Sequence, residues 1–430
     1  MQQAIYVTLG PPHLSPQTLA QRYSTLRARS EEITAPLSAE DCQVQSMADA
    51  SPIKWHLAHT TWFFETFILE PYADRYVAFD PSFKVLFNSY YNGVGDKHPR
   101  PDRGLLSRPS LDRVLAYRAH VDAAMAAFLQ DEVQAASMRQ LVTLGFNHEQ
   151  QHQELMLTDV KHLLSSNPLQ PQYIDHNDQP HEVIIDPTTR TSFSGGLVEI
   201  GHCGEHFAFD NEGPRHQTFL RPYQLANRLV TQREYLAFMA DGGYTRHELW
   251  LSEGWDRVNA NGWRAPLYWR EDAHTGGCGG WAEFTLHGTR ALVLDAPVTH
   301  VSFFEADAYA RWSGARLPTE AEWEHAAESV ERSALARSLR PAFQPTAAAE
   351  PGLTQLFGSA WQWTASAYLA YPGFETAEGA VGEYNGKFMC NQFVLRRSSV
   401  VTSVGHERVS YRNFFPPDKR WQFTGIRLAY

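Results

Sequence analysis

The chain has 430 residues, of which 43% are apolar and 20% charged, so it is a folded protein too long for one ordinary hydrophobic core. Its net charge of −11, from 37 basic and 48 acidic residues, argues against nucleic acid as a partner, because phosphate binding requires a basic surface. No apolar stretch is long enough to span a bilayer, so we expect no membrane partner. The four cysteines form no C-x-x-C pair, which argues against cysteine-bound structural zinc and fits a cytoplasmic location.

The chain up to about residue 170 is predicted to form four long helices. Ser15-Pro16 and Ser51-Pro52 each combine an N-cap residue with proline at the first helical position, and Ser110 is a third N-cap. These signals predict helices over residues 15–34, 51–69 and 110–130, followed by a fourth over 136–165. Four such helices are typical of a four-helix bundle, in which metal sites are built from inward side chains of facing helices.

The connection between the second and third helices, residues 70–109, is too long to be only a connector. Loops of this length are usually functional or disordered, and the aromatic residues of this one argue against disorder. It contains two neighbouring tyrosines, Tyr90 and Tyr91, and two arginines three residues apart, Arg100 and Arg103.

From about residue 170 the pattern changes to short segments separated by Gly, Pro, Asn and Asp, and tryptophan becomes frequent. We therefore predict a multidomain protein with an α-helical domain over residues 1–170, a linker over 171–190 and an α+β domain over 191–430. The 12 tryptophans are consistent with a large aromatic core and also with a pocket for an organic cation.

A metal site is predicted from three histidines. His148 and His152 are four residues apart, so both imidazoles lie on one face of a helix and can reach one ion. They belong to a stripe with Leu144 and Leu155 that should face the bundle interior, and His59 lies on a similar stripe of the second helix. Unsatisfied buried polar groups cost roughly 1–3 kcal/mol each, which a metal would offset. Three neutral imidazoles suit zinc, iron, nickel or copper, and the ligands alone do not separate hydrolysis at zinc from O2 chemistry at iron.

The same stretch also matches His-Glu-x-x-His, the zinc-protease signature, in which Glu149 would be the general base. Against this interpretation, Leu155 replaces the glycine of the extended motif, His162 has the wrong spacing for a third ligand, and Glu149 lies off the stripe. Hydrogen-bonded core histidines without a metal are the other alternative.

Several strings in the second half carry a resemblance to a known family. They are Asn227-Arg228-Leu229-Val230-Thr231, Ala315-Arg316-Leu317-Pro318-Thr319-Glu320-Ala321-Glu322-Trp323-Glu324, Trp361-Gln362-Trp363-Thr364 and Gly425-Ile426-Arg427-Leu428-Ala429. Together they resemble the formylglycine-generating enzymes, whose fold is C-type-lectin-like. The first half, with its Trp55-His56-Leu57-Ala58-His59 segment, resembles a DinB-like four-helix bundle. The fusion of the two resembles the EgtB family, the sulfoxide synthases of ergothioneine biosynthesis.

This resemblance implies an Fe(2+)- and O2-dependent enzyme that joins the sulfur of a cysteine-type thiol to the imidazole C2 of hercynine and oxidises it to a sulfoxide. The family's three iron ligands match His59, His148 and His152. Gln151 matches a hercynine-site residue, and Arg100 and Arg103 match the pair that binds the thiol's carboxylate.

Near the C-terminus, Asn413 and Phe414 match the segment that receives the trimethylammonium group. Phe415 stands where the best-known branch has an aspartate for γ-glutamylcysteine, so free cysteine is expected here. For the family's proton-donating tyrosine, the candidates are Tyr90 with Tyr91, which we prefer, and Tyr368 with Tyr371. Tyr371 is also a candidate substrate contact.

Three alternatives stay open: the same reaction with γ-glutamylcysteine, an ovothiol-type synthase acting on histidine, and a non-catalytic metal-binding module. The copper-binding cysteine pair of formylglycine-generating enzymes is not evident. The family's Arg-Gly-Gly-Ser reads Arg396-Arg397-Ser398-Ser399 here, so the sequence does not predict the backbone conformation of this segment.

Overall fold

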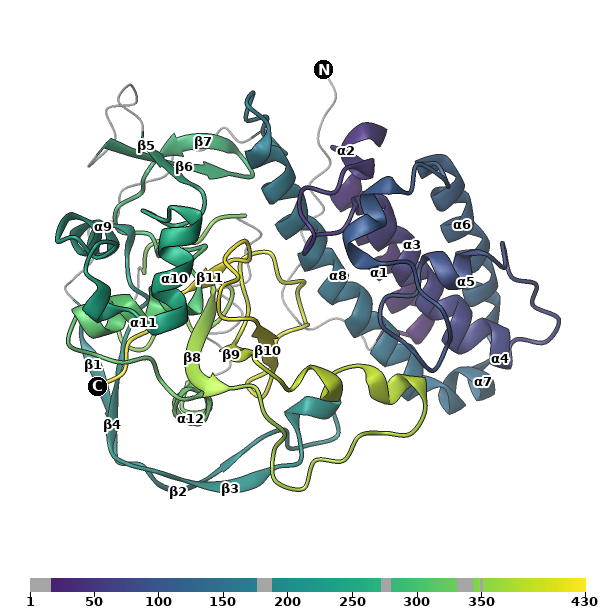
Figure 1. Ribbon diagram of the computed structural model, residues 1–430. Coiled ribbons are helices and arrows are strands. Elements are labelled where there is room, and N and C mark those ends of the chain that lie inside the picture. Colours follow the sequence, from purple (N-terminus) through teal and green to yellow (C-terminus); the bar gives the residue numbers. More distant parts are fainter. Residues whose placement is uncertain (1–16, 176–187, 272–279, 331–342, 349–350) are drawn as a thin grey trace.

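The computed structural model describes residues 17–175, 188–271, 280–330, 343–348 and 351–430. A helical bundle from the first part of the chain packs beside a mixed α/β part, with α8 between them (Figure 1). The predicted order of domains is observed: a helical domain precedes a domain of mixed helices and strands, which we call the lectin-like domain. Among the described residues, no helix is both long and apolar enough to cross a membrane.

The four long helices lie close to their predicted positions. They are α1 (Leu19–Thr34), α3 (Ile53–Phe64), α6 (Leu111–Phe128) and α8 (Arg139–Ser166), and a π-helical segment, η1 (Glu65–Leu69), extends α3. The expected Ser15-Pro16 start lies outside the described residues, and the side chain of Thr18 caps α1. All 12 residues of α3 are buried, because this helix is enclosed by its neighbours on every side.

Shorter elements complete the bundle. The long connection after η1 is ordered by a buried amide, Asn88, which donates to the carbonyl oxygens of Tyr91, Gly95 and Asp96 at 2.9–3.2 Å. The short elements are α2 (Ala39–Gln43), α4 (Glu70–Tyr72), α5 (Phe83–Leu86), the 3₁₀ helix η2 (Arg100–Leu105) and α7 (Glu132–Ser137).

The C-terminal part is built around a four-stranded sheet in the order β10-β9-β8-β11, in which β11 runs parallel to β8 and the other pairs are antiparallel. Its strands are β8 (Trp361–Ala367), β9 (Phe393–Arg396), β10 (Arg412–Phe415) and β11 (Thr424–Gly425). Three smaller sheets consist of β1 (Arg190–Phe193) with β4 (Tyr223–Ala226), β2 (Gly196–Ile200) with β3 (His216–Leu220), and β5 (Trp269–Glu271) with β6 (Trp281–Thr285) and β7 (Gly288–Ala291). The helices are α9 (Gln232–Ala240), α10 (Ser252–Asn261), α11 (Phe303–Trp312) and α12 (Glu320–Glu328).

The strings that carried the resemblance have structural roles in the lectin-like domain. Thr319 and Glu322 form a capping box at the start of α12, and Arg316 binds both oxygens of Glu322 at 2.7 Å. Trp323 is fully buried, and its indole donates to Gln362 at 2.8 Å. Buried Arg427 bonds the same Gln362 and two backbone carbonyls. These motifs therefore determine the fold and not the chemistry.

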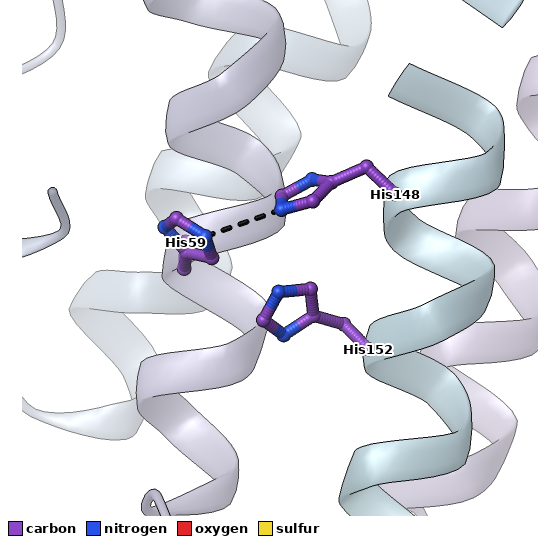
Figure 2. Close-up of side chains that lie close together, drawn as sticks. All are labelled: His59, His148 and His152. Atoms are coloured by element: carbon purple, nitrogen blue, oxygen red, sulfur yellow. Dashed lines mark hydrogen bonds between the residues drawn. The ribbon is translucent and has the colours of Figure 1, made fainter. Parts of the chain in front are cut away.

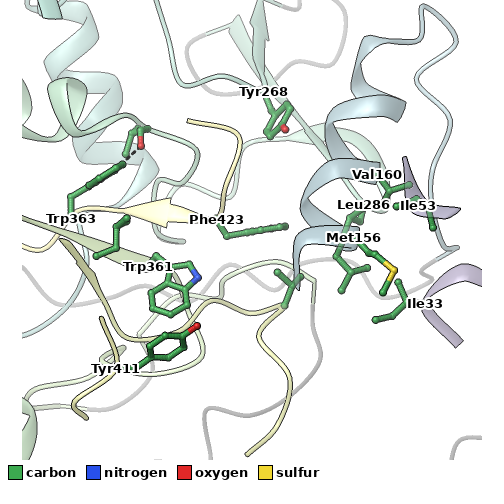
Figure 3. Packing of buried hydrophobic residues seen from close by; sticks show 14 of the residues in the cluster. Ile33, Ile53, Met156, Val160, Tyr268, Leu286, Trp361, Trp363, Tyr411 and Phe423 are labelled. Atoms are coloured by element: carbon green, nitrogen blue, oxygen red, sulfur yellow. Dashed lines mark hydrogen bonds between the residues drawn. The ribbon is translucent and has the colours of Figure 1, made fainter. Parts of the chain in front are cut away.

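The two parts share one continuous core. Met156 and Val160 of α8 belong to the same cluster as Leu286, Trp361 and Phe423 of the lectin-like domain (Figure 3). The junction is polar as well. The carboxylate of Glu154 on α8 accepts hydrogen bonds from Trp361, Ser399 and Thr402 at 2.6–2.7 Å.

The first residues of the expected linker also belong to this junction. The backbone amides of Tyr173 and Ile174 donate to Leu286, and the Tyr173 hydroxyl donates to the carbonyl of Ile33 in α1. Residues 176–187, the remainder of that expected linker apart from its last three positions, lie outside the described residues. Cys278 also lies outside them, and the other three cysteines are free thiols.

Candidate active site

One ring nitrogen from each of His59, His148 and His152 lies within 4.8 Å of the other two. His59 comes from α3, and the other two project from successive turns of the facing α8 (Figure 2). Nε2 of His148 and Nε2 of His59 are 3.2 Å apart. The structure thus brings His59 together with two histidines that follow almost ninety positions later in the sequence.

The surroundings leave these imidazoles neutral. Burial, and then neighbouring histidines, lower the pKa of His59 and His152 well below the usual value, and burial lowers that of His148 to about 3. His59 is held by stacking on Trp55 and Trp62 at ring distances of 4.5 and 5.4 Å, and its Nδ1 contacts the carbonyl of Phe87 at 2.6 Å.

This donor set fits a transition metal. The Nδ1–H of His59 donates to a carbonyl, which leaves its Nε2 lone pair directed at Nε2 of His148. Nδ1 of His148 is buried and has no hydrogen-bond partner among the described residues. Three neutral imidazoles whose free nitrogens face one another are the ligands that iron, zinc, nickel and copper accept.

A fourth histidine, His56, was not predicted to take part. It is 2% exposed, and its Nδ1 lies 2.8 Å from Nδ1 of His152, whereas its Nε2 lies 3.1 Å from a carboxylate oxygen of Asp159. The i, i+3 spacing of His56 and His59 on one helix was the available signal, but the sequence does not show that His56 points toward α8.

A cavity of about 490 Å³ lies beside this group, between the bundle and the lectin-like domain. It includes most of the predicted site residues from both halves of the chain. Those that line it are Tyr90, Arg100, Arg103, His148, Gln151, His152, Asn413, Phe414 and Phe415.

Arg103 is a buried cation on the wall of this cavity. Its guanidinium lies 3.3 Å from the ring centre of Trp55 and donates to the hydroxyls of Ser51 and Ser89 at 2.9 and 3.1 Å. Burial, followed by the charge of Arg100, lowers the pKa of Arg103 to about 8. Neutral hydroxyls and an aromatic face stabilise this cation without neutralising it.

The cavity rim has two more cations and a carboxylate. Arg100 is exposed, and its guanidinium donates to the carbonyl of Asp49 at 2.6 Å. The carboxylate of Asp49 accepts from Lys419 of the lectin-like domain at 2.6 Å. Asp49 and Glu154 are the acidic residues of the cavity lining, and Glu154 is already bonded to three donors.

Gln151 is fixed between two tyrosines of the lectin-like domain. Its amide nitrogen donates to the Tyr411 hydroxyl at 2.7 Å, and its amide oxygen accepts a short hydrogen bond from Tyr384. Tyr384 also packs edge-on against His148, with ring centres 5.8 Å apart. The sequence analysis missed both tyrosines: no motif surrounds Tyr384, and Tyr411 comes just before the Asn413–Phe415 segment that the resemblance identified.

The C-terminal segment supplies an aromatic wall. Phe414 stacks on Tyr368 at 4.0 Å between ring centres and lies 6.0 Å from Phe388. Phe415 packs edge-on against Trp421 at 5.6 Å. The side chain of Asn413 accepts from the backbone amide of Phe414, which fixes its orientation.

Three of the predicted site residues do not line the cavity: the ligand candidate His59, which lies behind it in α3, and the tyrosines Tyr91 and Tyr371. The ring of Tyr91 is fully buried against Trp62, Phe67 and Tyr90. Tyr371 donates to Glu320 at 3.2 Å, and the guanidinium of Arg412 covers its ring. The expected substrate contact of Tyr371 is therefore corrected: its hydroxyl is used inside the lectin-like domain.

Glu149 lies off the histidine stripe as predicted, and it is fully buried where α8 contacts α1 and α6. Burial alone would raise its pKa, but the guanidiniums of Arg27 and Arg118, at 2.9 and 3.4 Å, lower it below the usual value. Its carboxylate is thereby committed to an ion-pair network with α1 and α6, which leaves no base for a protease mechanism.

Two family models match the chain. Residues 22–156 match the DinB superfamily, and residues 179–336 match the sulfatase-modifying factor enzyme 1-like domain. The chain is 30% identical to the hercynine oxygenase of Mycobacterium tuberculosis over 97% of this chain and 99% of that protein.

Two further relatives agree. The hercynine oxygenase of Mycolicibacterium thermoresistibile is 29% identical over 97% of this chain and 95% of that protein. Ergothioneine biosynthesis protein 1 of Schizosaccharomyces pombe is 26% identical over 52% of this chain and 28% of its own length. The order of the two domains, the histidine group between α3 and α8, and the near full-length identity lead to one conclusion: the chain belongs to the EgtB-like hercynine oxygenase family.

Proposed function

We propose that this protein is an iron(II)- and O2-dependent oxidoreductase that joins cysteine to the imidazole C2 of hercynine, giving hercynylcysteine sulfoxide. The observation that carries the proposal is the three-histidine group beside a cavity that also holds an unneutralised guanidinium and an aromatic wall. Iron(II) bound by His59, His148 and His152 would supply O2 binding and oxidation of the thiol. The remaining residues orient the two organic substrates.

The aromatic wall suits the trimethylammonium group of hercynine. That cation has no N–H to donate, so it is recognised by aromatic faces and carbonyl dipoles. Phe414 and Asn413 supply these, as the family resemblance implies, and Tyr384 and Tyr411 add two faces. Because both tyrosines hold the amide of Gln151, that side chain is pre-oriented for a polar contact to the imidazole ring.

The opposite end of the cavity suits a free amino acid. Arg103 has no carboxylate partner among the described residues and offers a planar donor set to the carboxylate of the thiol substrate. Asp49 already accepts from one ammonium group, that of Lys419, and would accept from the α-ammonium of cysteine. In γ-glutamylcysteine that nitrogen is an amide, and Phe415 offers no carboxylate to its distant amino group. Cysteine is therefore the proposed donor.

A tyrosine hydroxyl is expected to deliver a proton during the reaction. Burial is the main cause that raises the pKa of Tyr90, Tyr91 and Tyr384, so each keeps its proton at neutral pH. Tyr90 lines the cavity, and Tyr91 stacks on it at 4.6 Å. We assign the donor role to this pair, and Tyr384 becomes the competing candidate. The variant that loses sulfoxide product while retaining iron and substrate binding identifies the donor.

The direct test is anaerobic loading with iron(II), followed by O2, hercynine and cysteine, with mass spectrometry of the product. We expect hercynylcysteine sulfoxide. Formation of product only with γ-glutamylcysteine would show that this thiol, and not cysteine, is the substrate. Turnover of histidine in place of hercynine would indicate the ovothiol-type reaction. Tightly held zinc without O2 consumption would indicate the non-catalytic module.

The ligand set is tested separately. His152→Ala is expected to abolish stoichiometric iron binding, measured by metal analysis after desalting, because two imidazoles on opposite helices hold the ion less well than three. Retention of one iron per chain in this variant would contradict the assignment.

A further inference from the structure

The metal ligand His152 is the first member of a hydrogen-bonded relay that crosses the domain boundary. The relay runs from His152 to His56 at 2.8 Å and from His56 to Asp159 at 3.1 Å. Asp159 is one-twentieth exposed, and its second carboxylate oxygen accepts from the indole of Trp421 at 3.0 Å. His152, His56 and Asp159 belong to the bundle, whereas Trp421 belongs to the lectin-like domain.

The direction of each hydrogen bond follows from Asp159. Its carboxylate accepts from the backbone amide of Ser51 at 2.9 Å and from Trp421, so it acts as an acceptor toward His56 too. His56 therefore donates from Nε2, and its neutral ring accepts at Nδ1. The bond to His152 is then donated by Nδ1–H of His152, which leaves Nε2 of His152 as the only lone pair for a metal.

This arrangement parallels that of His59, whose Nδ1–H is held by the carbonyl of Phe87. Ligand histidines generally require such an outer partner to set the tautomer and the ring orientation. For His59 the partner is backbone of the bundle itself. For His152 the partner is a side-chain relay, and its outermost donor, Trp421, comes from the other domain.

We infer that His56 and Asp159 are positioning residues that present Nε2 of His152 to the metal, and that docking of Trp421 completes this arrangement. The inference rests on the proposed metal site, but it concerns affinity for the ion and not turnover. The lectin-like domain thus contributes to the metal centre without supplying a ligand.

The test uses the full-length protein and cobalt(II) or zinc(II), with affinity measured by chelator competition. Asp159→Asn is the decisive variant. Its amide can donate to Nε2 of His56, which reverses the relay and places the proton of His152 on Nε2. We expect metal affinity to fall by roughly 10–100-fold and the cobalt(II) absorption bands to weaken as one nitrogen ligand is lost. Trp421→Phe removes the indole donor and keeps an aromatic ring, and we expect a smaller, several-fold loss.

The matched control is His162→Gln. His162 is a half-buried histidine on the same helix, and its Nδ1 contacts the Ser46 hydroxyl at 2.8 Å, away from the ligands. It should bind cobalt(II) like the unmodified protein. Thermal unfolding of the metal-free variants separates stability from affinity.

Wild-type affinity and an unchanged cobalt spectrum in Asp159→Asn would overturn the inference, even if that variant unfolds more easily. Failure of the unmodified protein to bind either ion would overturn the metal site together with the relay. Metal binding through the relay, but without sulfoxide formation by the iron-loaded enzyme, would overturn only the proposed reaction.

Discussion

Among single residues, the charged side chains Arg103 and Asp49 occupy different parts of the cavity. Arg103 lies on the wall and has no anionic partner in the described parts of the chain, whereas Asp49 lies at the rim and already binds one ammonium group. The family resemblance indicated the arginine pair, but it did not distinguish the role of Arg100 from that of Arg103. Only the structure distinguishes the buried cation from the exposed one, because η2 turns one side chain inward and the other toward solvent.

The first prediction concerns thiol selectivity. Asp49→Asn should lower kcat/KM for cysteine by roughly 10–100-fold, because a hydrogen bond between charged groups contributes about 1.5–3 kcal/mol. The same change should leave 3-mercaptopropionate, which lacks the ammonium group, almost unaffected. Steady-state kinetics with both thiols measures this.

The control is Asp418→Asn, because Asp418 lies 3.8 Å from the same Lys419 and does not line the cavity. An equal loss for both thiols in Asp49→Asn would show that Asp49 does not recognise the ammonium group.

The second prediction concerns Lys161, a fully buried lysine whose Nζ lies 2.7 Å from Nε2 of His300. Burial lowers its pKa to about 7, far below its value in an unfolded chain. Between pH 7 and about 10.4 the unfolded state therefore binds more protons than the folded state, so stability should rise with pH in this window.

Lys161→Met should remove that rise and stabilise the protein near pH 7 by roughly 1–3 kcal/mol. Urea unfolding at pH 7 and pH 9 measures the free energy of unfolding of the wild type and of Lys161→Met. The control is Lys97→Met, at an exposed position. A parallel pH dependence in wild type and Lys161→Met would contradict the assignment.

At the element scale, α8 has two buried faces. One face carries Glu149 and Gln153 toward α1, and the other carries His148 and His152 toward α3 and the cavity. An amphipathic pattern in the sequence predicts one buried face of a helix. It therefore does not predict the second buried face of a helix that lies between two domains. The stripe identified from sequence was the one that faces the cavity.

The third prediction concerns the segment after β9. Arg397 has a φ of +97°, a region that favours glycine, and its buried guanidinium has no hydrogen-bond partner among the described residues. Such backbone strain costs about 1–3 kcal/mol, which exceeds the roughly 0.5–1 kcal/mol that glycine loses in entropy.

Arg397→Gly, which restores the family's residue, should therefore stabilise the protein by about 1 kcal/mol or more. Chemical unfolding measures the change. Asn391→Gly is the control, because asparagine tolerates its φ of +52° and should show little gain. A loss of stability in Arg397→Gly would contradict the prediction.

In the molecule as a whole, the proposed active site lies at the junction of the two parts. Its proposed metal ligands come from the bundle, the aromatic wall comes from the lectin-like domain, and Gln151 on α8 is held by tyrosines of that domain. The shared core fixes the relative position of these groups (Figure 3).

The fourth prediction tests that junction. Glu154→Ala leaves the donors of Trp361, Ser399 and Thr402 without their acceptor, which should cost roughly 3 kcal/mol of docking between the two parts. We expect calorimetric unfolding to separate into two transitions and native-state proteolysis to accelerate. Glu154→Gln, which retains one acceptor oxygen, should have an intermediate effect on both measurements. Glu132→Ala, at an exposed position, should unfold and be cleaved like the wild type. A single unshifted transition in Glu154→Ala would contradict this role.

The helix positions, the lectin-like motifs and the three histidines could be predicted from the sequence, because they depend on local periodicity, capping and fixed spacing. The sequence also indicated Gln151, Arg103 and the Asn413–Phe415 segment through family resemblance. The tertiary structure was needed to show that His56 and Asp159 support His152, that Tyr384 and Tyr411 hold Gln151, and that Tyr371 lies outside the cavity. These contacts join residues 51 to 262 positions apart in the sequence, and no local pattern encodes which side chains the packing of two domains brings together.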